Sequence, residues 1–179
     1  EGAAVSLDDL QRCAAMAADA TVIVFSHGGS YLSARRAGPV WSNAQQFGKL
    51  LSGRRVYAFA CDTFTPSARL LWGHFAEQAV TACISVFAGH AAPVMSPSIE
   101  QGAASAEIEA ALFELIERFV DGEQDQDTLR SIGESRVSWD LPVELDLPSD
   151  DPDQEGAFGW SSALFLGQFF KSLCIRTKA

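Results

Sequence analysis

Thr21-Val-Ile-Val-Phe25 and Arg55-Val-Tyr-Ala-Phe-Ala60 are the two stretches that decide the fold class. Both are dominated by a continuous run of β-branched and aromatic residues, without the alternation of apolar and polar positions that marks a half-exposed strand. Continuous hydrophobicity over so short a run is typical of a strand that is buried on both faces, as in a parallel sheet. The sequence therefore predicts two strands of one mainly parallel sheet.

Helical patterns separate and follow these strands. The segment Ser42-Asn-Ala-Gln45 is a capping-box pattern, an apolar helical face comes after it, and Gly53 is placed to end the helix. After the second strand, Thr65-Pro66 is typical of an N-cap and a first helical turn. The apolar segment 82–88 predicts a third strand. This β-α-β-α-β order is that of an α/β fold.

The remaining segments add helices around the sheet. Apolar residues recur at helical spacing over 103–120, which predicts a helix with one inward stripe. We also predict a short helix over 6–18, a helix over 127–136 and a further buried strand over 162–166. The predicted fold class is therefore α/β, with a mainly parallel sheet flanked by helices.

We expect one domain over the whole chain, 1–179, because 47% of its residues are hydrophobic and its length is that of an ordinary domain. Since the first residue is Glu1 rather than Met, we expect this domain to be a fragment of a longer chain. Residues 140–157 are predicted to form an acidic surface loop, because aspartates stand there among three prolines. The carboxylates lack the spacing of a calcium loop, so we expect no metal and no cofactor.

The net charge and the cysteine content exclude several classes of binding partner and structural site. The chain has 13 Lys and Arg against 23 Asp and Glu, for a net charge of −10, and its only close basic pairs are Arg35-Arg36 and Arg54-Arg55. We therefore expect no nucleic-acid partner, and a basic partner is easier to accommodate than an acidic one. The four cysteines form no C-x-x-C motif, which argues against a zinc knuckle or a disulfide framework. The apolar runs are too short for a membrane span, and we expect a cytoplasmic protein.

Two chemically useful residues follow the two deciding strands. His27 comes shortly after the first strand and Cys61 directly after the second. Parallel β-α-β units place the carboxyl ends of their strands at one edge of the sheet, where open α/β folds hold ligands. If the strands are neighbours, they lie about 4.8 Å apart, so the two side chains can meet across one crevice. An imidazole that removes the proton of a thiol is the minimal set for nucleophilic catalysis.

Taken singly, each residue has an ordinary structural explanation. A cysteine at a strand end is usually a small buried hydrophobe, and a lone histidine is usually a polar core or surface group. Their equivalent positions on consecutive strands, with Gly28-Gly29 after the histidine, favour a catalytic pair. Glycine lets the backbone amides approach a reacting carbonyl closely. Asp62 and His90 are weaker candidates: Asp62 for attracting a basic substrate residue, and His90 for lining the crevice or replacing His27 as base.

The strand followed by His27-Gly28, a helix, and the strand ending in Ala60-Cys61 resemble the caspase-like cysteine peptidases, the clan that includes caspases, gingipains, separases and the CHAT peptidases. The CHAT group is the most similar, because the resemblance continues downstream. Residues 80–88 resemble its third core strand, 119–130 its helix–Gly–helix segment, and 160–167 its closing strand with a tryptophan.

The resemblance implies a caspase-like three-layer sandwich and a cysteine endopeptidase that cleaves peptide bonds through a thioester acyl-enzyme. It implies that Cys61 is the nucleophile and His27 its dyad partner, with the amides of Gly28 and Cys61 as the oxyanion hole. The partners implied are a protein or peptide substrate and a regulatory protein or attached domain. The chain departs from the family in having Asp62-Thr63-Phe64, with no glycine, after the nucleophile, and only one short helix before the first strand.

These departures motivate an alternative, a catalytically degenerate caspase-like interaction module. A reactive thiolate at Cys61 would argue against it. A third hypothesis is an α/β-hydrolase, because Ser26-His-Gly-Gly-Ser30 is similar to the oxyanion motif of esterases. The chain has no G-x-S-x-G motif, however, and its other histidines fit no late triad position.

Overall fold

The architecture comes from a computed structural model. The residues that it describes are 11–12, 15, 19–26, 28–29, 32–34, 38–41, 43–67, 73–92, 103–136 and 162–178. The predicted acidic loop, 140–157, lies outside the described residues, as does nearly all of the helix predicted over 6–18.

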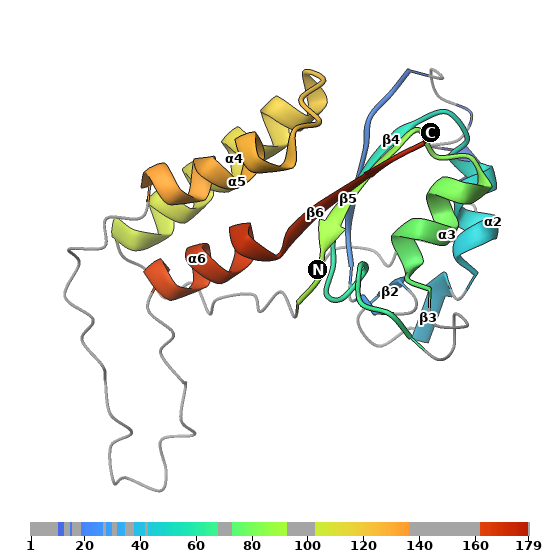
Figure 1. Cartoon of the computed structure of the whole chain (residues 1–179), viewed down its shortest axis with the longest axis horizontal. Helices are drawn as coiled ribbons and strands as arrows, with labels where there is room; N and C mark the ends of the chain where they lie inside the picture. The colour runs from blue at the N-terminus through green and yellow to red at the C-terminus, as the bar shows by residue number, and fades with distance from the viewer. Residues whose placement is uncertain are drawn as a thin grey trace, which may run out of the picture.

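A four-stranded sheet forms the centre of the chain (Figure 1), in the order β1-β4-β5-β6. The first three strands in this order are parallel, and β6 runs antiparallel to β5. A separate antiparallel pair joins β2 and β3. The strands are β1 (Val22–Phe25), β2 (Leu32–Ala34), β3 (Gly38–Trp41), β4 (Arg55–Phe59), β5 (Val86–His90) and β6 (Leu173–Thr177). The predicted α/β class with a mainly parallel sheet is confirmed.

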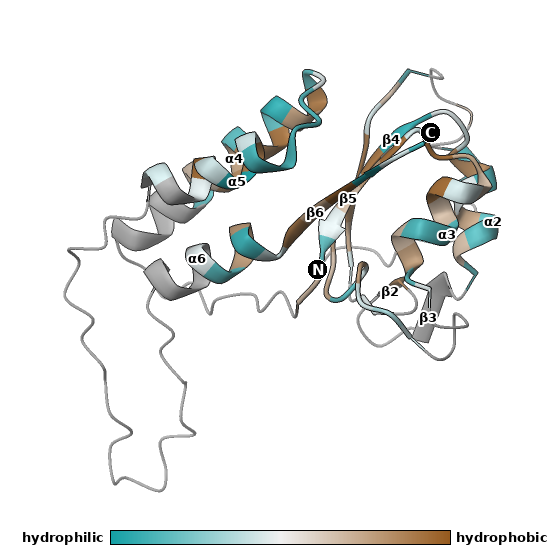
Figure 2. Ribbon diagram, in the orientation of Figure 1, coloured by the Kyte–Doolittle hydropathy of each residue, from teal (hydrophilic) through white to brown (hydrophobic). Residues whose placement is uncertain are grey.

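Helices cover both faces of this sheet. Helices α2 (Ala44–Leu50) and α3 (Phe75–Ala82) lie on one side, and three more helices lie on the other side (Figure 1). These three are α4 (Ala103–Val120), α5 (Gln126–Arg136) and α6 (Ser162–Ser172). The central strands are mostly hydrophobic along their length (Figure 2), because a strand between two helical layers meets no water on either face.

Strand β4 shows how one strand serves two cores. Val56 and Ala58 point into the core with α2 and α3, whereas Tyr57 belongs to the core with α4, α5 and α6. Successive side chains of a strand alternate between the two faces, so an unbroken apolar run fills both cores. The prediction that this run is buried on both faces is confirmed, since Val56, Tyr57 and Ala58 are at most 1% exposed.

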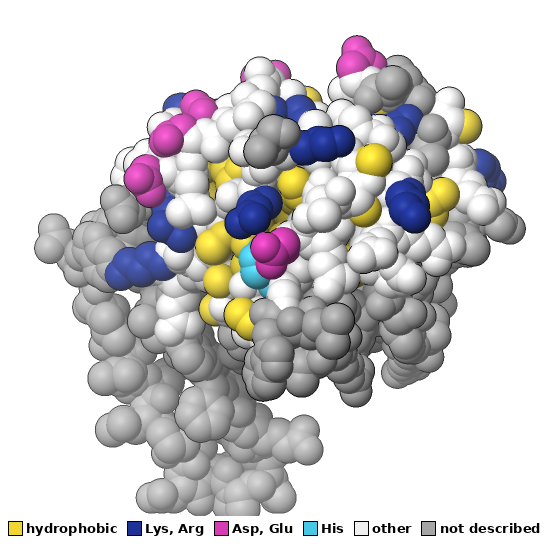
Figure 3. Space-filling model, turned by 45° about the vertical axis from the view of Figure 1, so that its right-hand side comes forward, with side chains coloured by type: hydrophobic (Ala, Val, Ile, Leu, Met, Phe, Trp, Pro, Cys, Tyr) yellow, Lys and Arg dark blue, Asp and Glu magenta, His cyan; other side chains and the backbone are white. Residues whose placement is uncertain are grey.

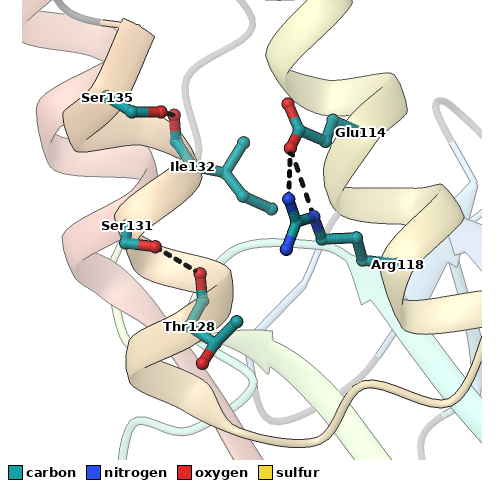
Figure 4. Close-up of polar contacts among 6 residues, drawn as sticks. All are labelled: Glu114, Arg118, Thr128, Ser131, Ile132 and Ser135. Atoms are coloured by element: carbon teal, nitrogen blue, oxygen red, sulfur yellow. Dashed lines mark hydrogen bonds and ion pairs between the residues drawn. The ribbon is translucent and has the colours of Figure 1, made fainter.

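The helices predicted over 103–120 and 127–136 are confirmed as α4 and α5. Ala111, Leu115 and Phe119 form the buried stripe of α4. On its outer part, the guanidinium of Arg118 donates to the carboxylate of Glu114 at 2.9 Å, one turn away (Figure 4). Such a pair adds about 0.2–0.5 kcal/mol to a helix, so burial of the stripe contributes more to the stability of α4.

The strand predicted over 162–166 is wrong, because this segment begins α6. The closing strand is β6, which begins eleven residues later. A short apolar run does not distinguish a buried strand from a buried helix. Here tertiary packing decides: adjacent Phe169 and Phe170 are both buried, and Phe170 lies so close to Gly133 of α5 that a β-carbon at 133 would clash with its ring.

The helix predicted after Thr65-Pro66 falls partly on residues 68–72, which lie outside the described residues. The helix described in this region is α3. It begins at Phe75, and its N-cap is His74, whose Nδ1 accepts the amide proton of Glu77 at 3.0 Å. His74 is therefore the cap of α3. Helix α3 extends to Ala82, where the third strand was predicted to start, and that strand, β5, starts at Val86 instead.

Strand β1 was predicted to be buried on both faces, but it is more exposed than β4. It occupies one edge of the four-stranded sheet, its first three residues are half-buried, and Phe25 is 66% exposed. Its run of apolar residues matches that of β4, but a strand at a sheet edge has a neighbour on one side only. The hydrophobic pattern predicts a strand here and does not show its place in the sheet.

Candidate active site

The strands β1 and β4 stay paired up to their carboxyl ends. Phe25 and Phe59, the last residues of the two strands, are direct partners in the parallel register. One residue further, the amide of Ser26 donates to the carbonyl of Phe59 at 3.2 Å. The structure therefore places the ends of the two deciding strands side by side, as the sequence predicted. Cys61 follows two residues after Phe59.

Gly28 packs directly on the peptide of Cys61. A β-carbon at position 28 would clash with the carbonyl oxygen of Cys61 and would lie 2.8 Å from its amide nitrogen. Only glycine allows this approach without a shift of the backbone. The structure thus brings together the two residues whose amides were predicted to form the oxyanion hole. Gly28 and Cys61 are both partly buried.

His27 lies outside the described residues, so its pairing with Cys61 stays a prediction. Its chain neighbours, Ser26 and Gly28, are both described, and each contacts the backbone of residues 59–61. Cys61 is half-buried and takes part in no disulfide. A partly exposed thiol is more accessible to a substrate than one in a packed core.

The turn after Cys61 has an unusual backbone. Asp62 has a φ of 53°, in the left-handed region where aspartate is one of the few tolerated non-glycine residues. Its amide donates to the carbonyl of Ala92 at 3.3 Å, and its carboxylate accepts the hydroxyl of Thr65 at 3.2 Å. The Thr65 hydroxyl also lies 3.0 Å from the carbonyl of Ala91. Asp62 therefore remains at the half-exposed turn, where its predicted attraction for a basic substrate is untested.

Thr63 anchors this turn to the end of β5. Its side chain is fully buried, and its hydroxyl accepts the amide proton of His90 at 3.1 Å and lies 3.4 Å from the carbonyl of the same residue. A β-carbon at Gly89 would clash with this hydroxyl. The carbonyl of Thr63 accepts from the amide of Ala76, in the first turn of α3, at 3.0 Å.

No local pattern in the sequence singles out Thr63. Its role depends on a contact between two strand ends that lie far apart along the chain. The available clue was Gly89, because a glycine inside a strand often marks a close approach of other atoms. The turn that carries Cys61 is thus enclosed between Gly28 on the β1 side and Gly89 on the β5 side.

His90 does not line a crevice, contrary to expectation. It is 0% exposed, its Nε2 lies 3.1 Å from the hydroxyl of Tyr57, and its Nδ1 lies 2.9 Å from Oγ of Ser172. Its ring also packs on Phe169, with centroids 4.3 Å apart. Burial lowers the pKa of His90 to about 3, although a backbone hydrogen bond with Phe169 acts in the opposite direction. The ring is therefore neutral and enclosed, which is unsuitable for a general base or a substrate contact.

The tautomer of His90 follows from its partners. The hydroxyl of Ser172 donates to the carbonyl of Phe169 at 2.8 Å, so this hydroxyl has no second proton for His90. With the Ser172 proton assigned in this way, Nδ1 of His90 carries the ring proton, and Nε2 accepts from the hydroxyl of Tyr57. Burial raises the pKa of Tyr57 above its usual value, which keeps this donor protonated. The network ties β4, β5 and α6 together.

The described residues bear on three kinds of binding feature: a metal site, a membrane-spanning helix and a basic surface patch. Among these residues, no group of three or more His, Cys, Asp or Glu side chains is placed to hold a metal ion. No helix in the described part of the chain is long and apolar enough to cross a membrane. On the face drawn in Figure 3, basic side chains are spread out, with acidic ones between and beside them. That face thus offers no concentrated basic patch.

No protein-family model, no curated protein and no solved structure matches this chain. The resemblance to the caspase-like peptidases therefore rests on the short motifs of the sequence alone. What the site does has to be argued from its own residues and their geometry.

Proposed function

We propose that this chain is a cysteine endopeptidase with a caspase-like three-layer fold, in which Cys61 is the nucleophile and His27 its general base. The observation that carries the proposal is the contact of Gly28 with the Cys61 peptide at the carboxyl ends of two paired parallel strands. This edge is where open α/β sheets hold their ligands. A half-buried thiol at such an edge has a position suited to catalysis.

In the proposed reaction, His27 takes the proton of the Cys61 thiol, and the sulfur attacks the carbonyl carbon of the scissile peptide bond. The amides of Gly28 and Cys61 donate to the oxyanion that forms. The C–N bond then breaks, and the leaving amine takes the proton from His27, which leaves a thioester on Cys61. Water attacks the thioester after giving a proton to His27, the C–S bond breaks, and the proton returns to the sulfur.

The turn after Cys61 supports this role by holding the nucleophile in place. Hydrogen bonds of Asp62, Thr63 and Phe64 fasten the turn to residues 90–92, at and just after the end of β5. A nucleophile must stay within a fraction of an ångström of its productive position. The buried hydroxyl of Thr63 contacts both the amide and the carbonyl of His90, and these two contacts restrict the movement of the turn.

The test is cleavage of a peptide library by the wild-type chain, by Cys61→Ala and by the matched control Cys174→Ala. Cys174 is another half-buried thiol, located in β6, two strands from β4, with its sulfur 4.0 Å from the guanidinium of Arg130 on α5. We expect the wild type and Cys174→Ala to cleave the same peptides and Cys61→Ala to cleave none. Equal cleavage by Cys61→Ala and wild type would refute the proposal. Hydrolysis of small esters that survives this substitution would instead support the α/β-hydrolase hypothesis.

A degenerate interaction module is the second candidate. The observation that favours it is Asp62, a non-glycine residue in a left-handed conformation beside the nucleophile, where the family often has glycine nearby. Iodoacetamide labelling of Cys61 near pH 7 distinguishes the two functions. Burial raises the pKa of the Cys174 thiol, so the reference is Cys83, another half-buried free cysteine. Rapid labelling compared with Cys83 indicates a thiolate and supports the peptidase. Equal, slow labelling of Cys61 and Cys83 supports the module.

A further inference from the structure

An apolar groove opens next to the candidate active site. Its cavity volume is about 270 Å³. Side chains from β1, β4 and α4 line it: Phe25, Tyr57, Phe59, Glu109, Leu112, Phe113 and Ile116. Six of these seven lining side chains are apolar or aromatic, and Glu109 is the charged one.

The rim of the groove is exposed, whereas its base is buried. Phe25 is 66% exposed and Phe113 is 63% exposed, and the two stand on β1 and α4 respectively. Tyr57, at 1% exposure, belongs to the buried part. Its hydroxyl is hydrogen-bonded to His90 at 3.1 Å, so Tyr57 contributes its aromatic ring, and no free polar group, to the wall of the groove. Large exposed apolar side chains that gather around a concavity mark an interaction site.

The groove is continuous with the catalytic edge. Phe25 and Phe59 are the last residues of β1 and β4, and their ring centroids are 5.5 Å apart. Cys61 follows Phe59 by two residues, so their Cα atoms lie at most roughly 7 Å apart. The chain turns here, because the amide of Ala60 donates to the carbonyl of Ala58 at 2.9 Å. A substrate peptide that is extended over the thiol covers roughly 7 Å in about two residues. Its side chain close to the scissile bond therefore reaches the groove.

We propose that this groove receives one bulky apolar side chain, aromatic or aliphatic, of the peptide substrate. This inference rests on the proposed function. The cavity is slightly smaller than the roughly 300–1,000 Å³ of a typical small-molecule site, which suits one side chain of a peptide better than a cofactor. The Glu109 carboxylate at the groove disfavours an acidic substrate side chain through like-charge repulsion. The substrate class is thus a peptide with a large uncharged side chain near the cleaved bond.

The experiment compares Phe113→Asp with Val120→Asp in the full chain. Val120 is also an exposed apolar residue of α4, at 48%, but it does not line the groove. The starting point is a fluorogenic peptide that the wild type cleaves. Each position within three residues of its scissile bond is replaced in turn by Phe, Ala or Glu, which gives three peptides for every position. We expect kcat/KM to fall in the order Phe, Ala, Glu at one position, with about a tenfold preference for Phe over Ala. Phe113→Asp removes most of that preference, and Val120→Asp retains it.

Direct binding separates the two proposals. The uncharged fluorophore N-phenyl-1-naphthylamine is titrated into Cys61→Ala alone and into Cys61→Ala combined with Phe113→Asp, Phe113→Ala or Val120→Asp. Weaker binding in both Phe113 variants than in the Val120 variant supports an apolar site in the groove. Wild-type cleavage that is indifferent to Phe, Ala and Glu, or fluorophore binding that is unchanged in both Phe113 variants, overturns the inference and leaves the peptidase proposal intact. Cleavage that does not depend on Cys61 overturns the peptidase proposal, whatever the fluorophore binds.

Discussion

Thr63→Val removes one buried hydroxyl from the turn that carries Cys61 and keeps the shape of the side chain. The hydroxyl accepts the amide proton of His90 at 3.1 Å and lies 3.4 Å from its carbonyl. The carbonyl keeps a second partner, because the amide of Phe64 donates to it at 3.1 Å. The amide of His90 loses the acceptor that Thr63 provides, inside a fully buried part of the sheet.

The expected loss of stability follows from this one unsatisfied group. A buried donor without its acceptor costs about 1–3 kcal/mol, so we expect Thr63→Val to lower the free energy of unfolding by that amount. Thr63→Ser retains the hydroxyl and loses one methyl group, for a cost of about 0.8 kcal/mol. Thr65→Val, on the exposed side of the same turn, should change the free energy of unfolding by no more than about 0.5 kcal/mol.

Urea denaturation followed by circular dichroism measures all three variants, and the alkylation rate of Cys61 is recorded under native conditions. We expect Thr63→Val to change this rate and Thr63→Ser to restore it towards the wild-type value. The anchoring role of Thr63 is refuted if Thr63→Val is as stable as the wild type. It is also refuted if Thr65→Val costs as much, because an exposed hydroxyl would then be as important as the buried one.

Three further predictions concern separate parts of the structure. Gly28→Ala places a β-carbon against the peptide of Cys61, so we expect a loss of about 1–3 kcal/mol in thermal unfolding, and an unchanged melting temperature would contradict the close approach. His90 has a folded-state pKa lowered to about 3 by burial, so only the unfolded chain binds its proton between about pH 6.5 and 3. Stability is then retained above pH 6.5 and lost as the pH falls, with a slope approaching 1.4 kcal/mol per pH unit from this one group. Urea titrations at several pH values should show a shallower slope for His90→Gln, and an equal slope would disprove the buried neutral imidazole. Gly133→Ala drives a β-carbon into the ring of Phe170 and should cost about 1–3 kcal/mol; a neutral effect in denaturation would show that α5 and α6 do not pack closely here.

The places of Cys61, Gly28 and His90 in the structure differ in how far the sequence could predict them. The positions of Cys61 and Gly28 at adjacent strand ends could be predicted, because two hydrophobic runs and the residues after them are local features. The burial of His90 could not be predicted, since its partners Tyr57 and Ser172 are 33 and 82 residues away along the chain. A residue that follows a strand in the sequence can point to the edge of the sheet or into a core, and the helices packed above it decide between the two.

The sequence by itself determined the elements whose hydrophobic pattern is strong and regular: β1, β4, α4 and α5. In α4 and α5 the apolar residues recur at helical spacing, and in β1 and β4 a short run of β-branched and aromatic residues favours a strand, so local chemistry specifies these elements. Tertiary structure decided the rest. It made a helix of the segment at 162 by packing Phe170 on Gly133, and it left β1 at an edge of the sheet. The physical reason is that burial and hydrogen-bond satisfaction depend on which distant segments meet, and their energies exceed the small differences in local propensity.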